Sequence, residues 1–308
     1  MPLDPGSVPL HTKTGVPMLV VQTWKTKTMP LDWQPSPESF ARHMPGWQHL
    51  ITTDEENQAF VARWFPDYLP TYMAFPHNIQ RVDAWRYCWL YVMGGMYCDG
   101  DIAITQSLEP LLEMTMEPGT TQVWLPRSPN FGHVLTNCLM ASVRHAPVWL
   151  RVLRATQLPP PLFAAGKHMV VMTTTGAGML QRTLGQNLLE EGVVAVLPTH
   201  LVMPCSVCHA QPCKPTADTY AKALPGGGTW TGSDTGIINS VFCAVDRAFN
   251  TASRTTRPVS VATGTALLCA AVTMILVAAW LALALIGLGL RRLPALVPAW
   301  SSPAGSAE

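Results

Sequence analysis

The chain has little charge of either sign. Only 13% of its 308 residues are Asp, Glu, Lys or Arg, and the formal net charge is +1. No run of basic residues occurs, so the sequence lacks the electrostatic footprint of a protein that binds nucleic acid. We therefore expect no nucleic-acid partner, and the low charge directs attention to the apolar parts of the chain.

The N-terminal part does not resemble a secretory signal peptide. Residues 1–16 are polar and contain prolines, with no apolar run of the kind found in secretory signal peptides. No Asn-x-Ser/Thr sequon occurs anywhere in the chain. We expect residues 1–16 to be disordered, and both absences favour a folded domain that faces the cytosol.

A long hydrophobic run is present only near the other end of the chain. Residues 262–290 hold no charged residue and are rich in Ala, Leu, Val and Ile. Roughly 20 such residues cross a bilayer, so this run predicts a transmembrane helix. Two arginines lie on each side of it, which leaves its orientation open: Arg254, Arg257, Arg291 and Arg292.

These features predict one folded domain and a membrane anchor. About 240 residues precede the hydrophobic run, which is enough for a single large α/β core. The expected organisation is a disordered N-terminus, a folded domain, a juxtamembrane stalk, a transmembrane helix and a disordered tail, in this order: 1–16, 17–245, 246–261, 262–290 and 291–308.

The eight cysteines fall into two groups. Five are scattered in apolar surroundings and are expected to be free, small core residues: Cys88, Cys98, Cys138, Cys243 and Cys269. The others form the cluster Cys205-x-x-Cys208-His209-x-x-x-Cys213. The spacing is compatible with a structural zinc site, with a disulfide or with free thiols in a loop, and all three remain open.

Runs of proline and glycine mark two breaks in the folded domain. Pro159–Pro161 is expected to separate a helix over 145–156 from a strand over 168–173. Gly226–Gly228 predicts a flexible loop, which can either close over a ligand or serve as a plain linker.

Residues 78–101 form the most informative segment, with the sequence NIQRVDAWRYCWLYVMGGMYCDGD. Asn78 is a candidate N-cap for a helix whose apolar residues follow helical spacing. Gly94 and Gly95 are expected to end this helix, because glycine accepts the left-handed conformation that helix ends favour. A short apolar strand, Met96 to Cys98, is predicted to follow.

Two aspartates stand where this predicted strand ends. Residues i and i+2 of an extended chain point the same way, so Asp99 and Asp101 can face one cation, with Gly100 leaving room for a ligand. Mg²⁺ and Mn²⁺ prefer carboxylate and phosphate oxygens. A cation held here can neutralise the charge on a departing nucleoside diphosphate.

Simpler interpretations stand beside this one. Asp-Gly-Asp is also common in solvated turns. Asp83 and Arg86 lie three residues apart and share one face of the predicted helix, so they can belong to the same site or form a purely structural ion pair. The residues alone leave these alternatives open.

The segment as a whole resembles the DXD-containing sugar-binding region of family 32 glycosyltransferases. That group includes yeast-type mannosyltransferases that act on inositol phosphorylceramide or on glycoproteins. Eleven positions match its pattern at fixed spacing: Arg81, Asp83, Arg86, Tyr87, Leu90, Tyr91, Gly94, Gly95, Tyr97, Asp99 and Asp101. The resemblance is strongest over 78–104 and extends more weakly over 17–232.

Shorter pieces are similar to other parts of the family. Val20–Trp24 resembles its first strand, and Trp47–Asp54 resembles its second strand. Thr175-Gly176 is similar to a Thr-Gly-Pro turn, with Ala177 in place of proline. Thr229-Trp230 is similar to the final Ser-Trp, without the histidine that often precedes it.

The resemblance implies a GT-A fold, in which a mostly parallel α/β sheet has helices on both faces and the nucleotide lies at the carboxyl ends of the strands. The implied catalytic residues are Asp83, Arg86, Asp99 and Asp101, of which the last two hold the metal and the diphosphate. Asp83 and Arg86 are expected to contact the ribose or the transferred sugar. The implied donor-binding set also includes Trp24 near the nucleobase, Trp230 near the phosphates, and Arg81, Tyr87 and Gly95.

The resemblance also implies a function. It indicates a membrane-anchored, metal-dependent, retaining glycosyltransferase that uses Mn²⁺ or Mg²⁺ and a GDP-mannose or UDP-sugar donor. The expected acceptor is an inositol phosphorylceramide-like lipid or a glycoprotein, at an endoplasmic reticulum or Golgi-type membrane. Relatives commonly face the Golgi lumen, so the side of the membrane stays open. The alternative is a catalytically degenerate GT-A fold that acts as a membrane-tethered binding module.

Overall fold

The computed structural model describes most of the predicted folded domain. The described residues are 3–128, 135–162, 164, 166–202, 215–227 and the single positions 236, 240 and 243. The chain divides into two units, Met1–Arg247 and Ala248–Glu308, and the second lies outside the described residues. The predicted stalk, transmembrane helix and tail therefore also lie outside them. Within the described ranges, no helix is long and apolar enough to cross a bilayer.

Most described strands form one mixed sheet of six strands, in the order β2-β1-β3-β6-β5-β7. Their bounds in this order are Gln48–Thr52, Leu19–Thr23, Gly95–Cys98, Leu139–Ser142, Val123–Pro126 and Val194–Leu197. Strand β6 pairs antiparallel with both of its neighbours, and the other pairs are parallel. Five of the six strands thus run in one direction, which agrees with the mostly parallel sheet that the resemblance implied.

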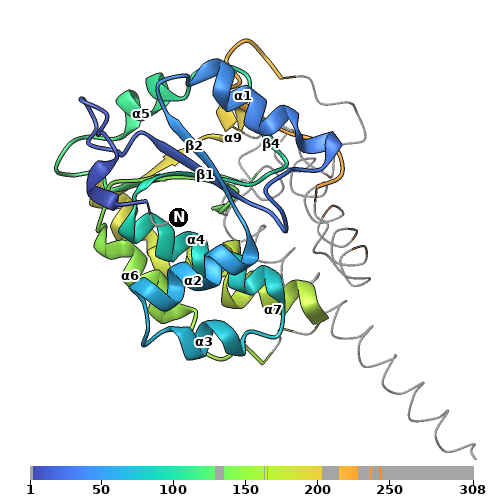
Figure 1. The fold of residues 1–308 in the computed structure, drawn as a ribbon. Coiled ribbons are helices and arrows are strands. Elements are labelled where there is room, and N and C mark those ends of the chain that lie inside the picture. The colour runs from blue at the N-terminus through green and yellow to red at the C-terminus, as the bar shows by residue number, and fades with distance from the viewer. Residues whose placement is uncertain are drawn as a thin grey trace, which may run out of the picture. The chain divides into compact units, whose positions relative to one another are not determined.

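Helices cover both faces of this sheet (Figure 1). The helices are α1 to α9, with the bounds Pro35–His43, Asp54–Trp64, Leu69–Ala74, Asn78–Val92, Glu109–Thr115, Pro147–Ala155, Gly166–Thr174, Ala177–Glu190 and Thr199–Val202. One apolar cluster joins the sheet to α2, α4, α6 and α8, and a second joins it to α1, α5 and α9. Neighbouring residues of β1 divide between them: Leu19 and Val21 belong to the first cluster and Val20 to the second.

The predicted helix of residues 78–93 is confirmed as α4, with one correction at its start. The N-cap is His77, and the side chain of Asn78 instead donates a hydrogen bond to Asp54 Oδ2, at 3.0 Å. The Gln80 side chain accepts a hydrogen bond from the backbone N–H of His77, at 3.2 Å. The sequence pattern alone could not show which of these two adjacent polar residues is the N-cap, because the role of Asn78 depends on its contact with α2.

The double glycine ends α4 and begins β3, as predicted. Gly94 and Gly95 have positive φ angles of 63° and 80°. A Cβ at Gly95 would also collide with the carbonyl oxygen of Leu19 on the neighbouring strand β1. Gly95 therefore permits both the turn and the close approach of two strands.

A second, two-stranded sheet brings a distant segment beside the two aspartates. Strand β4, Ile102–Ile104, pairs antiparallel with β8, Ala221–Ala223. The backbone N–H of Leu224 then donates a hydrogen bond to the carbonyl of Asp101, at 2.7 Å. At Gly227 a Cβ would collide with the Asp101 carboxylate. The first part of the predicted glycine loop thus lies against Asp101, and Gly228 lies outside the described residues.

The predicted strand over 168–173 is wrong, because these residues lie in α7. A short apolar run cannot be assigned to a strand or to a buried helix from its pattern alone. Thr173 and Thr174 donate hydroxyl hydrogen bonds to the carbonyls of Met169 and Val170, one helical turn earlier, at 2.6 and 2.7 Å. Such bonds accommodate threonine within a helix. The helix predicted around 145–156 is confirmed as α6.

Two further expectations differ from the structure. Residues 5–7 form a short 3-10 helix, and Val8 and Val16 are buried in the two apolar clusters, although the N-terminus was expected to be disordered.

Cys88, Cys98 and Cys138 are free and buried, as predicted. Cys243 is disulfide-bonded, against the prediction of a free thiol, because an apolar sequence context does not reveal which sulfur lies nearby. The cluster Cys205–Cys213 lies outside the described residues.

Candidate active site

A cavity of about 330 Å³ opens at the carboxyl ends of three adjacent parallel strands. Trp24 follows β1, Asp54 follows β2 and Asp99 follows β3, and all three line it. This is the position at which open α/β sheets bind ligands. The structure therefore supplies a pocket of substrate size at the edge of the sheet where the motif residues converge.

The cavity brings together five of the nine predicted site residues: Trp24, Asp83, Arg86, Asp99 and Asp101. Three others do not line it. Arg81 donates a hydrogen bond to the carbonyl of Phe75 at 2.8 Å, Tyr87 is fully buried behind the cavity, and Gly95 packs against β1. Trp230 lies outside the described residues.

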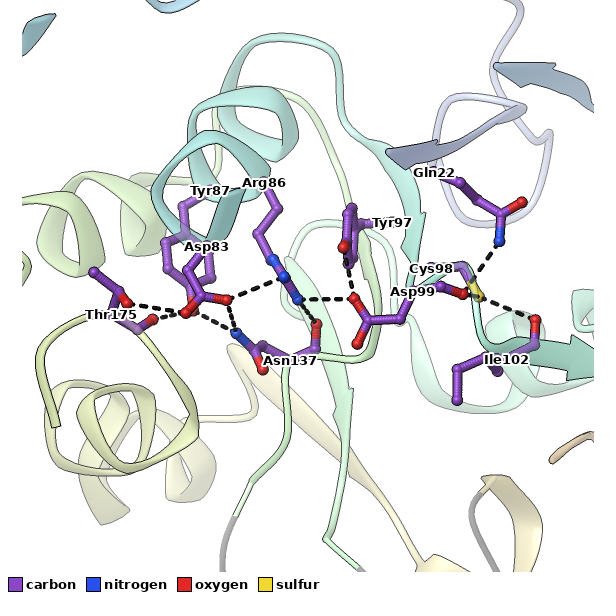
Figure 2. A network of polar contacts seen from close by, with 10 residues as sticks. All are labelled: Gln22, Asp83, Arg86, Tyr87, Tyr97, Cys98, Asp99, Ile102, Asn137 and Thr175. Atoms are coloured by element: carbon purple, nitrogen blue, oxygen red, sulfur yellow. Dashed lines mark hydrogen bonds and ion pairs between the residues drawn. The ribbon is translucent and has the colours of Figure 1, made fainter. Parts of the chain in front are cut away.

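Arg86 connects the two halves of the motif (Figure 2). Its Nη2 lies 3.0 Å from Asp83 Oδ1, and its Nη1 lies 3.2 Å from Asp99 Oδ1. The same Nη1 donates a hydrogen bond to the carbonyl of Asn137, at 2.8 Å, and the guanidinium stacks 4.3 Å from the Tyr97 ring centroid. The Asp83–Arg86 ion pair thus exists, and it also forms part of the cavity wall.

Asp83 is held by neutral donors as well as by Arg86. Its Oδ2 accepts a hydrogen bond from the Thr175 hydroxyl, and its Oδ1 accepts one from Asn137 Nδ2, both at 2.9 Å. Tyr87 supports both donors, since its hydroxyl donates to the Thr175 carbonyl at 2.6 Å and accepts from Asn137 at 3.0 Å. The Asp83 carboxylate is therefore fixed in one orientation.

Burial and charge act against each other in this network. Burial raises the pKa of Asp83 above its ordinary value, and the Arg86 charge opposes that rise. For Arg86, burial lowers the pKa, but the surrounding Tyr97, Asp99 and Asp83 raise it overall, so the guanidinium stays protonated. The three charged groups stabilise one another in a site where a lone charge would be costly.

Asp99 is fixed at one oxygen and open at the other. Oδ1 accepts hydrogen bonds from Tyr97, at 2.6 Å, and from Arg86. The Asp99 backbone is also held by hydrogen bonds. Its N–H donates to the Cys138 carbonyl at 2.7 Å, and the Gln22 side chain donates to its carbonyl at 3.2 Å. Oδ2 accepts no hydrogen bond from a described residue, and the side chain is 32% exposed.

Asp101 is the second carboxylate, and its environment opposes a negative charge. Burial, and then the nearby charge of Asp99, raise the pKa of Asp101 to about 7. Burial likewise raises the pKa of Asp99, with Arg86 opposing. A cation between them would offset both effects, and oxygen ligands suit Mg²⁺ or Mn²⁺. Within the described ranges no group of three or more acidic, histidine or cysteine side chains is placed to hold a metal, so phosphate or water oxygens would complete the coordination.

Several cavity residues were missed by the sequence interpretation. Trp33 stacks edge-on against Trp24, with ring centroids 4.8 Å apart, and donates from its indole to the Pro225 carbonyl at 3.0 Å. Lys25 and Lys167 also line the cavity. For Trp33, its position in a proline-bounded loop shortly after Trp24 was a weak sequence signal. Nothing in the sequence distinguishes Lys167 from the other lysines.

Comparison with known proteins identifies the domain that carries this site. Residues 30–117 match the family model described as the glycosyltransferase sugar-binding region containing DXD motif. This part of the chain is thus similar to a glycosyltransferase sugar-binding region. The match includes Asp83, Arg86, Asp99 and Asp101, and it confirms the resemblance that was strongest over 78–104. With five parallel strands, the antiparallel β6 and helices on both faces, the described part of the chain has a mixed α/β architecture.

Curated relatives of this chain are named inositol phosphoceramide mannosyltransferases or mannosyl phosphorylinositol ceramide synthases. Inositol phosphoceramide mannosyltransferase 3 of Schizosaccharomyces pombe is 32% identical over 169 residues, which are 54% of this chain and 44% of the relative. Mannosyl phosphorylinositol ceramide synthase CSH1 of Saccharomyces cerevisiae is 27% identical over 187 residues, 59% of this chain and 47% of the relative. The aligned region thus spans less than half of each relative.

Solved structures give a more distant comparison. Mouse xyloside xylosyltransferase 1 superposes on this chain with a TM-score of 0.44 and 9% identity, over 70% of this chain and 98% of that structure.

Proposed function

We propose that the protein is a metal-dependent, retaining glycosyltransferase that transfers a hexose, with mannose as the leading candidate, from a nucleotide sugar to an acceptor at a membrane. One observation carries the proposal. The open Oδ2 of Asp99 and the carboxylate of Asp101 line a cavity at the end of β3, beside a buried Asp83–Arg86 pair that belongs to the same network.

The cavity residues have distinct proposed roles. Asp99 and Asp101 would hold Mn²⁺ or Mg²⁺ against the donor diphosphate, where the ion would stabilise the departing nucleoside diphosphate. Trp24 and Trp33 offer an aromatic surface for the nucleobase. Asp83 accepts two hydrogen bonds and forms an ion pair with Arg86, so of its roughly four acceptor positions it retains capacity for a hydroxyl of the sugar.

The same bonds bear on the stereochemical course. A carboxylate held by two hydrogen bonds and an ion pair is a weak nucleophile, because each contact stabilises its charge in the ground state. Asp83 is thus suited to orient the sugar rather than to attack it. We favour front-face transfer, in which the acceptor enters on the side from which the diphosphate departs and the anomeric configuration is retained.

The finer assignments rest on the relatives. The names of the two relatives above describe a mannosyltransferase and a synthase of mannosylated inositol phosphoceramide. We take these names to favour GDP-mannose over a UDP-sugar as donor. The same names favour an inositol phosphorylceramide-like lipid over a glycoprotein as acceptor. An anchor at residues 262–290, in an endoplasmic reticulum or Golgi-type membrane, would keep the site near lipid headgroups.

The test is release of nucleoside diphosphate by the full chain from a panel of nucleotide sugars, with and without Mn²⁺ or Mg²⁺. The Asp99→Asn/Asp101→Asn variant is compared with Asp67→Asn, which changes an exposed aspartate outside the cavity. Release that depends on metal and donor, is lost in the double variant and is retained in Asp67→Asn supports the proposal. Metal-dependent donor binding without release would overturn it in favour of the binding-module alternative.

A further inference from the structure

Lys167 lies in the first turn of α7 and lines the cavity. It is half-buried, and it makes no ion pair with a carboxylate in the described ranges. This is unexpected in a cavity that four aspartates line. The cavity has three basic residues, and Arg86 is already bound to Asp83 and Asp99. Lys167 therefore remains available to bind an anion from solution.

The surroundings of Lys167 differ from those of the other available lysine. Lys25 follows β1 and its ammonium lies 5.6 Å from the Trp24 ring centroid, beside the aromatic surface assigned to the nucleobase. Lys167 belongs to the part of the wall made by α4 and α7, where Ile79, Val82 and Val171 also line the cavity. The two lysines thus serve different parts of the cavity.

Helix α7 also fixes how far Lys167 is from the catalytic network. It lies seven positions before Thr174, which corresponds to roughly 10 Å along the helix axis. Thr175, just beyond the helix, donates to Asp83. An anion at Lys167 would therefore bind apart from a sugar held at Asp83, on the part of the wall that the apolar Ile79, Val82 and Val171 also line.

We propose that Lys167 is a specificity-determining residue that binds a phosphate group of a substrate, and that its place on the α4–α7 wall favours the phosphodiester of the acceptor over the diphosphate of the donor. This rests on the proposed function for the identity of the two substrates. A lysine ammonium offers three donors on a flexible stem and binds phosphate as a point charge. The contact selects acceptors that carry a phosphate beside the hydroxyl that reacts.

The first experiment measures binding and needs no turnover. Calorimetry is used to titrate the full chain with myo-inositol 1-phosphate and with uncharged myo-inositol, for wild type, Lys167→Gln and the control Lys222→Gln. Lys222 is exposed on β8 and does not line the cavity. We expect Lys167→Gln to weaken binding of the phosphate about tenfold and to reduce its salt dependence, with Lys222→Gln unchanged. Equal affinity of Lys167→Gln and wild type for the phosphate would overturn the proposal.

The second experiment assigns the phosphate to one substrate. KM values are measured separately for the nucleotide sugar and for a phosphodiester-bearing acceptor in the three proteins. A rise of the acceptor KM alone in Lys167→Gln supports the acceptor assignment, and a rise of the donor KM alone overturns it. Nucleoside diphosphate release by wild type, measured independently, decides the proposed function. Failure of the lysine proposal is therefore visible even when the enzyme is active.

Discussion

The guanidinium of Arg86 on α4 lies 3.2 Å from the carboxylate of Asp99, which follows β3. The last turns of α4, the double-glycine turn and β3 lie between these residues in the sequence, yet Arg86 donates a hydrogen bond to Asp99. The contact makes the helix that carries Asp83 and the strand that leads to the two aspartates into one rigid unit. A change in Arg86 must therefore affect both the stability of the fold and the geometry of the site.

Replacing Arg86 by alanine should destabilise the protein by about 3–5 kcal/mol, because it leaves the buried Asp83 without its counter-charge. The measurement is the free energy of unfolding of the full chain in urea. The double variant Asp83→Asn/Arg86→Gln, which removes both charges, should lose less. A loss below about 1 kcal/mol for Arg86→Ala would contradict the view that this pair is energetically coupled.

Replacing Thr175 by valine should cost about 1–3 kcal/mol, because the shape is kept while the hydroxyl that donates to Asp83 Oδ2 is removed. Thr175→Ser retains the hydroxyl and is the matched control. Urea unfolding distinguishes the two. The prediction fails where serine and valine destabilise the protein equally, since the loss would then come from packing of the methyl group rather than from the hydrogen bond.

Two glycines with similar φ angles should respond differently to alanine. Gly95 has φ 80° and faces the Leu19 carbonyl, whereas Gly15 has φ 71° and an added Cβ there has open space. Gly15→Ala should cost about 1 kcal/mol for the left-handed backbone alone. Gly95→Ala should cost about 3 kcal/mol or more, because β1 and β3 must also separate. Thermal unfolding of both variants checks the difference, and equal losses would refute the steric part of the argument.

His49 should make stability fall in mild acid. Burial lowers the pKa of His49 from 6.5 to about 4, and its Nε2 lies 2.9 Å from Gln22 Oε1. Between these pH values the unfolded chain binds a proton that the folded chain does not. The contribution is therefore complete above pH 6.5 and is lost as the pH falls toward 4, by up to about 3 kcal/mol.

The measurement is the free energy of unfolding at several pH values between 7 and 4, for wild type and His49→Gln. Other groups titrate in both proteins, so the difference between the two curves isolates His49. The difference should change by the stated amount across this range. Parallel curves would show that His49 titrates alike in the folded and unfolded states.

The departures from the family pattern have structural explanations in part. Ala177 stands where the family turn has proline, and it is the first residue of α8. Proline is tolerated at that position because the N–H it lacks has no partner within the helix, so alanine and proline are close to equivalent there. Thr175, two residues earlier, is present and donates a hydrogen bond to Asp83.

Sequence spacing was reliable where the structure is local. The end of α4 and the start of β3 follow from glycine conformation. Asp99 and Asp101 do line one cavity, but the extended chain predicted for them is wrong. Strand β3 ends at Cys98, and the two aspartates lie in a turn in which the Ile102 N–H donates to the Asp99 carbonyl at 3.1 Å. Spacing failed for α7, where an apolar run of four residues, Met169–Met172, fits a strand and a buried helix equally well. The N-cap predicted at Asn78 was also wrong, because this side chain donates a hydrogen bond to Asp54 on another helix.

Sequence spacing alone predicts two carboxylates after a strand, an oppositely charged pair on one helix face, and the order of these elements along the chain. Which groups contact these residues depends on the tertiary structure. Thr175 lies 92 residues from Asp83 and Asn137 lies 51 residues from Arg86, yet both complete the network. Such partners are set by how α7 and β6 pack on α4 and β3, and no local pattern encodes a contact that depends on the packing of the whole sheet.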